Sequence, residues 1–191
     1  MDNSLNRTID PPRNGILPDG KLVEQARQDP RAFGKVYDRY LDPIYRYVYN
    51  RTGNPADAED ITSQTFLAAL EGLPKYRENG YFAAWLFAIA RRKVADHYRS
   101  RRSQVDLDEV QFIWIDHEMD GSLIRNQRKE ALQKVLQALP EQDKELLRLR
   151  YLAELNFSDI ARLLKRSEPA VKKAYYRLID RIQQKMEVPN E

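Results

Sequence analysis

The 191-residue sequence contains no cysteine, and its histidines number only two. A disulfide framework, a thiolate metal site and a cysteine nucleophile are therefore excluded, and a histidine metal cage is not expected. The sequence also lacks a glycine-rich phosphate loop and a recognisable pairing of nucleophile and base. We therefore expect a protein that is not an enzyme and that needs no metal and no other cofactor.

Long apolar runs are missing too. The longest candidate, Ala83–Ala90, is far shorter than the roughly 20 residues that cross a bilayer, and arginines follow it. Residues 1–20 show neither the basic region nor the apolar region of a secretory signal. With 42% hydrophobic and 32% charged residues, the composition indicates a cytoplasmic, globular protein without membrane insertion.

Charge of one sign is concentrated in blocks, although the net charge is only +3. Residues 91–102 and 165–185 are strongly basic, and residues 103–126 between them are acidic. Two basic blocks around an acidic one suggest two surfaces that bind polyanions, joined by a segment that does not. On charge alone, two ordinary solvated helix faces would explain the pattern equally well.

Apolar residues recur at helical spacing almost throughout, and no segment alternates with the period of a strand. The sequence predicts an all-α fold with two small helical domains joined by an acidic flexible linker. Turn-forming residues support two of the expected boundaries: Asn54 and Pro55 begin a helix, and Asp42-Pro43 restarts or kinks one. The expected organisation is a flexible extension at 1–20, a helical domain at 21–102, a linker at 103–126, a second helical domain at 127–186 and a tail at 187–191.

The segment 156–182 has the layout of a helix-turn-helix, in which the second helix lies in the major groove of DNA. Val171, Tyr175 and Leu178 form the inner stripe of that helix, and its outer positions are mostly polar or basic. A helical hairpin with a solvated basic face is the alternative interpretation. The residues expected to contact DNA here are Arg166, Ser167, Ala170, Lys172, Lys173, Tyr176 and Arg177.

Several motifs of this C-terminal block resemble domain 4 of extracytoplasmic-function (ECF) sigma factors, a branch of the bacterial sigma-70 family. These motifs are Leu149-Arg150-Tyr151-Leu152, Asp159-Ile160-Ala161 and Ser167–Lys172. The resemblance implies binding to the promoter −35 element and to the flap of the RNA polymerase β subunit. Lys165 stands where a glycine often occupies the turn, and Pro169 replaces a small flexible residue. These departures bear on the −35 preference and not on the kind of module.

The N-terminal block resembles domain 2 of the same family, through Asp57–Ile61, Gln64–Leu67 and Trp85–Arg91. Arg92 departs from the asparagine that is usual there. The resemblance implies that the start of the helix that contains Asp57–Ile61 docks on a coiled coil of polymerase β′. The expected polymerase-binding residues are Asp57, Glu59, Asp60 and Gln64, with Asp57 mainly in a local capping role and Glu59 and Asp60 at the interface.

A loop rich in aromatic residues, 75–82, precedes the basic helix 81–102. Stacking faces, an amide and phosphate partners are what an unstacked base needs, and the family uses this loop to capture a base of the −10 element. The alternative is that Tyr81, Phe82 and Trp85 belong to the core. The residues expected to act in −10 binding and melting are Tyr76, Arg77, Asn79, Gly80, Tyr81, Arg91, Arg92, Lys93, Arg99, Arg101 and Arg102.

Together these features predict a sigma factor that directs bacterial RNA polymerase to specific promoters and helps to melt the −10 region. Its expected partners are core RNA polymerase and promoter DNA, and the habit of the family adds an anti-sigma factor. The alternative function is a stand-alone helix-turn-helix regulator whose N-terminal helices sense a ligand or dimerise. The basic run behind an aromatic loop argues against that alternative.

Overall fold

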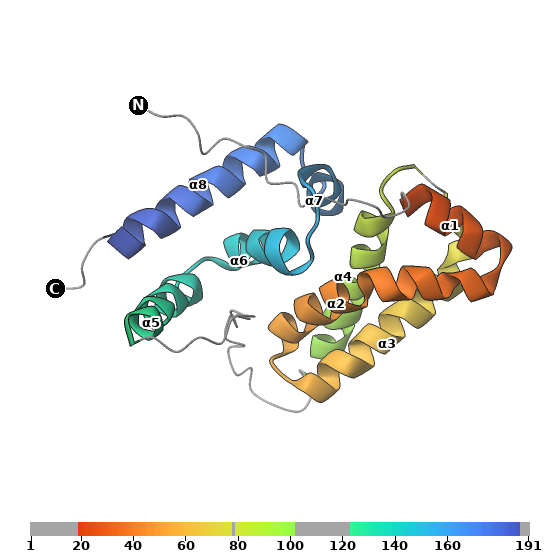
Figure 1. Ribbon diagram of the computed structural model, residues 1–191, viewed down its shortest axis with the longest axis horizontal. Helices are drawn as coiled ribbons and strands as arrows, with labels where there is room; N and C mark the ends of the chain where they lie inside the picture. Colours follow the sequence, from red (N-terminus) through yellow and green to blue (C-terminus); the bar gives the residue numbers. More distant parts are fainter. Residues whose placement is uncertain (1–18, 78, 102–122, 188–191) are drawn as a thin grey trace.

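The computed structural model describes residues 19–77, 79–101 and 123–187, and the regular structure within these ranges is entirely helical (Figure 1). The expected all-α fold class is confirmed. Residues 1–18 of the expected extension, most of the expected linker, Arg102 and residues 188–191 of the expected tail lie outside the described residues. Asp19 and Gly20, expected in the extension, and Glu187, expected in the tail, are helical instead. Within the described ranges, no helix combines the length and the apolar character that a membrane span requires.

Four α-helices and two short 3-10 turns make up the N-terminal half. They are α1 (Asp19–Gln28), η1 (Pro30–Ala32), α2 (Phe33–Thr52), α3 (Pro55–Gly72), η2 (Leu73–Lys75) and α4 (Phe82–Arg101). The start of α3 is as predicted: the Asn54 side chain accepts a hydrogen bond from the Asp57 backbone N–H, and Pro55 occupies the first turn. Gly53 ends α2 in the left-handed conformation at φ 67°.

The sequence left two alternatives at Pro43, a restart of the helix or a kink in it. The restart is wrong, because Pro43 neither ends α2 nor restarts it. The helix runs unbroken from Phe33 to Thr52 with Pro43 inside it. Proline removes one backbone hydrogen bond, but Tyr40, Ile44 and Tyr47 on both sides of it are fully or almost fully buried. The burial of this stripe against α3 and α4 holds the two segments in one helix.

The C-terminal half contains α5 (Leu123–Gln137), α6 (Glu141–Leu147), the π-helical turn η3 (Arg148–Leu152), α7 (Phe157–Leu164) and α8 (Glu168–Glu187). Helix α5 begins inside the segment that was expected to be linker, so the expected start of the second helical unit at 127 is four residues late. Asn156 caps α7, since its side chain accepts from the Asp159 backbone N–H at 2.7 Å.

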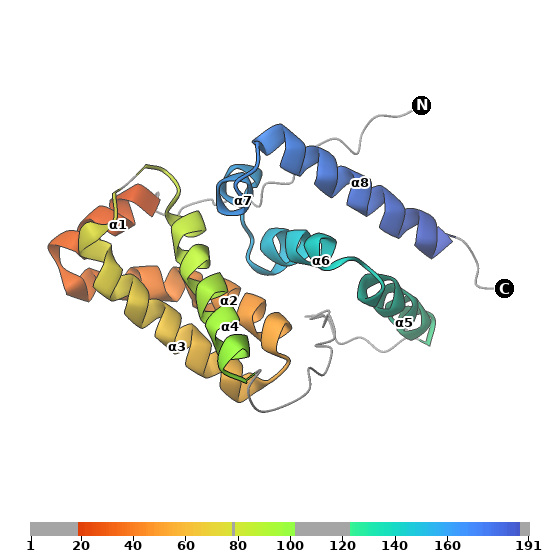
Figure 2. The ribbon, with the colours of Figure 1, turned by 180° about the vertical axis from the view of Figure 1, so that it is seen from behind.

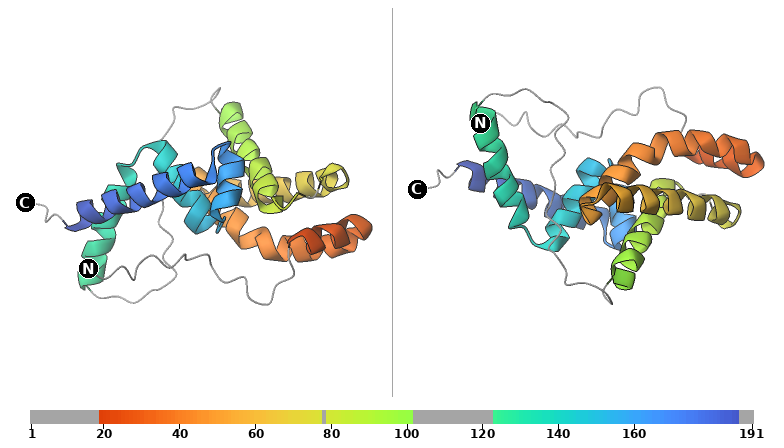
Figure 3. Two further views of the ribbon diagram at one scale, coloured as in Figure 1. Left: turned by 90° about the horizontal axis from the view of Figure 1, so that it is seen from above. Right: turned by 90° about the horizontal axis from the view of Figure 1, so that it is seen from below.

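The two halves lie side by side, with α6 and α7 of the C-terminal half next to α2 and α4 of the N-terminal half (Figures 1 and 2). Helices α7 and α4 are in contact, and so are η3 and α2. Views from above and below show α5 crossing α8 on the far side of the C-terminal half (Figure 3). The buried apolar side chains of both halves form one continuous cluster.

Candidate nucleic-acid interface

Helices α7 and α8 form the predicted helix-turn-helix. Lys165 ends α7 in the left-handed conformation at φ 54°, and the Arg166 N–H donates to the carbonyl oxygen of Ala161 at 2.9 Å. Val171 and Leu178 of α8 are completely buried, so the predicted inner stripe packs inward. Tyr175, the third member of that stripe, is half-buried, and its hydroxyl donates to the Tyr151 hydroxyl at 2.9 Å.

The outer face of α8 presents most of the residues that were expected to contact DNA. Arg166, Ser167, Lys173, Tyr176 and Arg177 are exposed, and Ala170 and Lys172 are partly buried. Lys172 differs from the two other cations on this helix face, because its Nζ lies 2.7 Å from a carboxylate oxygen of Glu168 and above the Phe157 ring. Lys173 and Arg177 are therefore the best-placed cations of α8 for phosphates.

An aromatic cluster beside this face was not anticipated from the sequence. Tyr175 and Tyr176 pack against Phe157, and Tyr151 packs against Tyr175. The Arg150 guanidinium lies 4.7 Å from the Phe157 ring centre. Burial, and then the hydrogen bond to Tyr151, raise the pKa of Tyr175 well above its usual value. Tyr175 and Tyr176 are neighbours on α8, but only the fold brings Tyr151 and Phe157 against them.

The N-terminal end of α3 carries the acidic residues that were expected to bind polymerase. The Asp57 carboxylate accepts from Arg101 at 2.8 Å and lies 3.6 Å from His97, so its partners are on α4 and its expected local capping role stays a prediction. Glu59 and Asp60 are exposed, and the Gln64 amide donates to Asp60 at 2.7 Å. This side of α3 can therefore present carboxylates to a basic partner.

The same helix exposes an apolar surface that the sequence did not lead us to expect. Leu70 is 38% exposed, and Leu67 is 58% exposed. Tyr37 of α2 is also exposed and packs against Phe66 in a tilted arrangement with ring centres 4.7 Å apart. Periodicity alone could not separate a face that packs inside the chain from one that is left uncovered.

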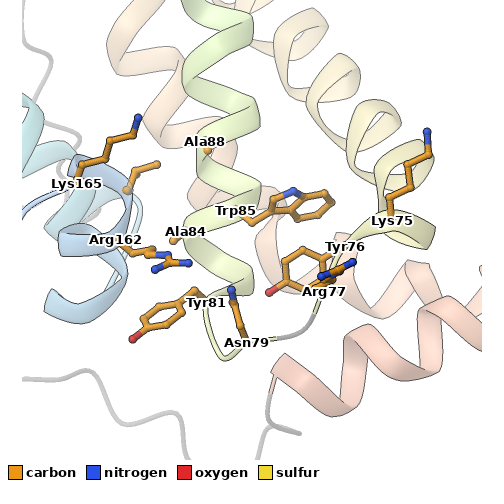
Figure 4. A pocket seen from close by; sticks show the side chains of 11 residues that line it. Lys75, Tyr76, Arg77, Asn79, Tyr81, Ala84, Trp85, Ala88, Arg162 and Lys165 are labelled. Carbon is orange, nitrogen blue, oxygen red and sulfur yellow. The ribbon is translucent and has the colours of Figure 1, made fainter.

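The aromatic loop (residues 75–82) lies where α3 ends and α4 begins (Figure 4). Arg77, Asn79 and Gly80 are exposed, and Gly80 has φ +81°, which only glycine adopts without strain. Tyr76, in contrast, is 8% exposed and packs against Phe82 and Trp85. Its expected role as a stacking face thus stays a prediction, and in this arrangement the ring belongs to the core.

Helix α4 distributes its cations in two directions. Arg92, Arg99 and Arg101 are exposed, and Lys93 is partly exposed. Arg91, however, points to the C-terminal half, where its Nε lies 2.9 Å from a carboxylate oxygen of Glu145. Most of the predicted basic face is therefore exposed, while Arg91 takes part in a contact between the two halves.

A pocket of about 510 Å³ connects the aromatic loop with the helix-turn-helix (Figure 4). Arg162 and Lys165 of the C-terminal half line it from one side, opposite Tyr76, Tyr81 and Trp85. The Arg162 guanidinium lies 5.2 Å from the Tyr81 ring centre. The two elements belong to separate modules in the sequence, so only the fold brings them to one pocket.

Comparisons with known proteins match two separate parts of the chain. Residues 36–104 match Sigma-70 region 2, and residues 129–182 match Sigma-70, region 4. The ECF RNA polymerase sigma factor BldN of Streptomyces coelicolor is 36% identical over 164 residues, which cover 83% of this chain. The match spans only 62% of the length of that relative.

Two solved structures have a similar fold. The structure of CnrH in complex with the cytosolic domain of CnrY covers 91% of this chain and all of its own chain, with a TM-score of 0.63 at 21% identity. The sigma factor RpoE in complex with the anti-sigma factor NepR, from Bartonella quintana, covers 83% of this chain and 98% of its own, with a TM-score of 0.59 at 20% identity. At these identities the likeness concerns the fold.

Proposed function

The chain belongs to the extracytoplasmic-function branch of the sigma-70 family, and we propose that it directs bacterial RNA polymerase to specific promoters and helps to open the −10 region. Both conserved regions of the family are present in the usual order. That order leaves the N-terminal helices to region 2 and gives them no separate sensing or dimerisation role. The family is non-enzymatic, so this chain acts by binding.

The observation that carries the proposal is the pairing of two basic surfaces, one in each matched region. The outer face of α8 offers exposed Lys173 and Arg177, and α4 offers exposed Arg92 and Arg99. A duplex-binding helix and a basic helix behind an aromatic loop are the two parts needed to read one promoter element and melt the other. The described helices of the first unit lie within residues 19–101, and those of the second lie within residues 123–187.

For the −35 element, α8 is the recognition helix. Its exposed cations neutralise phosphates, while Ser167, Ala170 and Tyr176 face the base edges. For the −10 element, Asn79 and Gly80 shape the turn that receives an unstacked base, with Tyr81 beside it. The exposed arginines of α4 then hold the phosphates of the opened strand.

For core polymerase, the exposed face of α3 is the docking surface on the β′ coiled coil. Glu59 and Asp60 supply negative charge, and Leu67 and Leu70 supply the apolar contact that charge alone does not provide. The C-terminal half binds the β flap. An anti-sigma factor is a further partner, as for the sigma factor RpoE bound to NepR, and the site of action is the cytoplasmic polymerase.

Reconstituted transcription tests the proposal. The full chain is mixed with bacterial core RNA polymerase and a library of genomic fragments, and the 5′ ends of the transcripts are sequenced. We expect the chain to co-elute with core polymerase and to produce start sites that share one pair of upstream elements. If core polymerase binds the chain but starts nowhere new, the proposed function is wrong.

A further inference from the structure

The aromatic cluster beside the recognition helix has a surface that the proposed function has not used. Its members are Tyr151 of η3, Phe157 at the start of α7, and Tyr175 and Tyr176 of α8. The centres of neighbouring rings lie between 5.3 Å and 6.3 Å apart. Tyr151 and Tyr176 are 45% and 46% exposed, so the aromatic cluster is not simply part of the core.

The hydroxyl groups of Tyr151 and Tyr175 form a pair within this cluster. Tyr175 is half-buried, and its hydroxyl donates to the Tyr151 hydroxyl oxygen at 2.9 Å. Burial raises the pKa of Tyr175 well above its usual value, so Tyr175 keeps the proton that it donates. A phenol that accepts one hydrogen bond can donate its own proton to another oxygen. Tyr151 can therefore offer a hydrogen-bond donor at the surface of the chain.

The place of Tyr151 in the helix-turn-helix suits a contact with the DNA backbone. In this motif the second helix enters the major groove, while the first helix crosses the backbone. The first helix, α7, lies beside the first turns of α8 (Figure 1). Turn η3 precedes α7, and ring contacts connect its Tyr151 through Tyr175 to Tyr176 on the outer face of α8. The aromatic cluster thus extends the surface of α8 toward the backbone side of the motif.

Two cations flank the aromatic cluster, but groups of the chain already hold both. The Arg150 guanidinium lies 4.7 Å from the Phe157 ring centre and donates to the carbonyl oxygen of Leu155 at 2.9 Å. The Lys172 ammonium lies 5.8 Å from the same ring centre and 2.7 Å from the Glu168 carboxylate. Their positive charge attracts a phosphate to this surface, while the direct contact is left to a neutral donor.

Packing alone is the alternative explanation of the tyrosine pair. Tyr47 shows what a packing tyrosine is like in this chain, because it is 1% exposed and its hydroxyl donates to the buried Glu145. Tyr151 differs, since nearly half of its surface is exposed. A tyrosine that serves only for packing needs its ring and not its hydroxyl. The two explanations therefore separate when the hydroxyl alone is removed.

From this geometry, and resting on the proposed function, we propose that Tyr151 donates a hydrogen bond to a backbone phosphate of the −35 duplex and that Tyr175 is its positioning residue. The contact reads no base, so it contributes affinity and helps to fix the register of α8 in the groove. The donor is neutral, which distinguishes it from Lys173 and Arg177. The hydrogen bond from Tyr175 orients the Tyr151 oxygen and, by polarising it, strengthens the bond that Tyr151 donates.

Removal of single hydroxyl groups from the full chain tests the proposal. Tyr151→Phe keeps the ring and removes the donor, and fluorescence anisotropy measures binding to a labelled DNA duplex of mixed sequence. We expect binding to weaken by roughly tenfold, as for the loss of a hydrogen bond to a charged group. The slope of the logarithm of affinity against the logarithm of salt should stay unchanged, because an uncharged phenol releases no counterion. Tyr45→Phe is the matched control and should bind as the parent chain does, since Tyr45 is a partly exposed residue of α2 that stacks on Tyr49.

Tyr175→Phe tests the positioning role. Alone, it should weaken duplex binding, but by a smaller factor than Tyr151→Phe does. When Tyr151→Phe is already present, adding Tyr175→Phe should weaken binding no further, because the donor that Tyr175 orients is gone. A purely structural role of Tyr175 predicts the same loss in both backgrounds. Circular dichroism and urea denaturation check that each variant keeps its helices and is folded under the conditions of the binding measurement.

The proposed contact is wrong if the folded Tyr151→Phe variant binds the duplex as tightly as the parent chain does. It is equally wrong if that variant lowers the salt slope, because the hydroxyl would then act through the placement of a cation. Equal losses from Tyr175→Phe in both backgrounds would overturn its positioning role. Failure of the proposed function looks different, because Tyr151→Phe would still weaken duplex binding while the parent chain gives no transcription with core polymerase.

Discussion

At the residue scale, Tyr47 shows how one buried hydroxyl joins the two halves. Its side chain is 1% exposed and donates to Glu145. Burial, and then the neighbouring Glu145 carboxylate, raise the pKa of Tyr47 far above its usual value of about 10. The folded chain therefore holds this hydroxyl protonated at every ordinary pH.

This shift predicts a pH dependence that Tyr47→Phe removes. The folded pKa lies above the unfolded one, so the stability due to the hydroxyl is complete below about pH 10 and decreases as the pH rises further. At pH 8 we expect the variant to unfold about 1 kcal/mol more easily, from the lost hydrogen bond. Above pH 10 the difference should shrink by about 1.4 kcal/mol per pH unit.

Urea denaturation of both proteins at pH 8, 10 and 11 measures the difference in the free energy of unfolding. A difference that stays constant over this range would contradict the burial of an un-ionised Tyr47. Comparing the two proteins at the same pH removes the contribution of all other titrating groups, since those are shared.

Lys173 and Arg177 carry a second residue-scale prediction, because both are exposed on the outer face of α8. Replacing the two with alanine should weaken binding of the full chain to duplex DNA. The slope of the logarithm of affinity against the logarithm of salt should fall by about 2, at roughly 0.9 per lost phosphate contact. The helices should survive, because the buried Val171 and Leu178 are unchanged.

Fluorescence anisotropy at several salt concentrations gives that slope. Lys185→Ala, an exposed cation near the end of the same helix, is the matched control and should change it by less. Weaker binding with an unchanged slope would place Lys173 and Arg177 away from the phosphates.

At the scale of elements, the aromatic loop has a proposed role in strand opening that α3 and α8 do not share. It contributes nothing to the contact surface on α3, and α8 lies in the other half. Asn79→Ala with Gly80→Val should therefore leave core-polymerase binding and recruitment to the −35 region intact. Strand opening should fail, since the amide is lost and valine cannot adopt φ +81° without strain.

Permanganate reactivity of thymines near the −10 element measures opening in the complex with core polymerase. A template with a pre-melted bubble should recover much of the lost transcription, because the cost of unstacking has already been met. Unchanged reactivity in the double variant would remove the loop from the melting step. Tyr76 is left intact in this test because its buried ring supports Phe82 and Trp85.

At the scale of the whole molecule, the two basic surfaces lie in different halves and each offers only a few exposed cations, with Arg91 paired to Glu145. The chain alone should accordingly bind duplex DNA weakly and with little sequence preference, and specific open complexes should require core polymerase. Anisotropy with and without core polymerase measures both. Tight, sequence-specific binding of duplex promoter DNA by the isolated chain would contradict this view and would favour a stand-alone regulator.

Much of this architecture follows from local sequence. The caps at Asn54 and Asn156, the all-helical pattern and the helix-turn-helix were predictable because capping and apolar spacing act within a few residues. Most of the expected DNA-facing side chains of α8 are exposed for the same reason, since one helix face follows directly from its period.

What local sequence could not determine is how the elements meet. The burial of Tyr76, the exposure of Leu70 and the unbroken path of α2 through Pro43 all depend on neighbours distant in the chain. The contact of Glu145 with Tyr47 and Arg91 is the clearest case, because those residues are 98 and 54 positions apart from it. Sequence alone thus determined which helices form and which family they belong to. Only the tertiary structure decided that the halves close on each other, because a buried charge is stable only where a distant partner meets it.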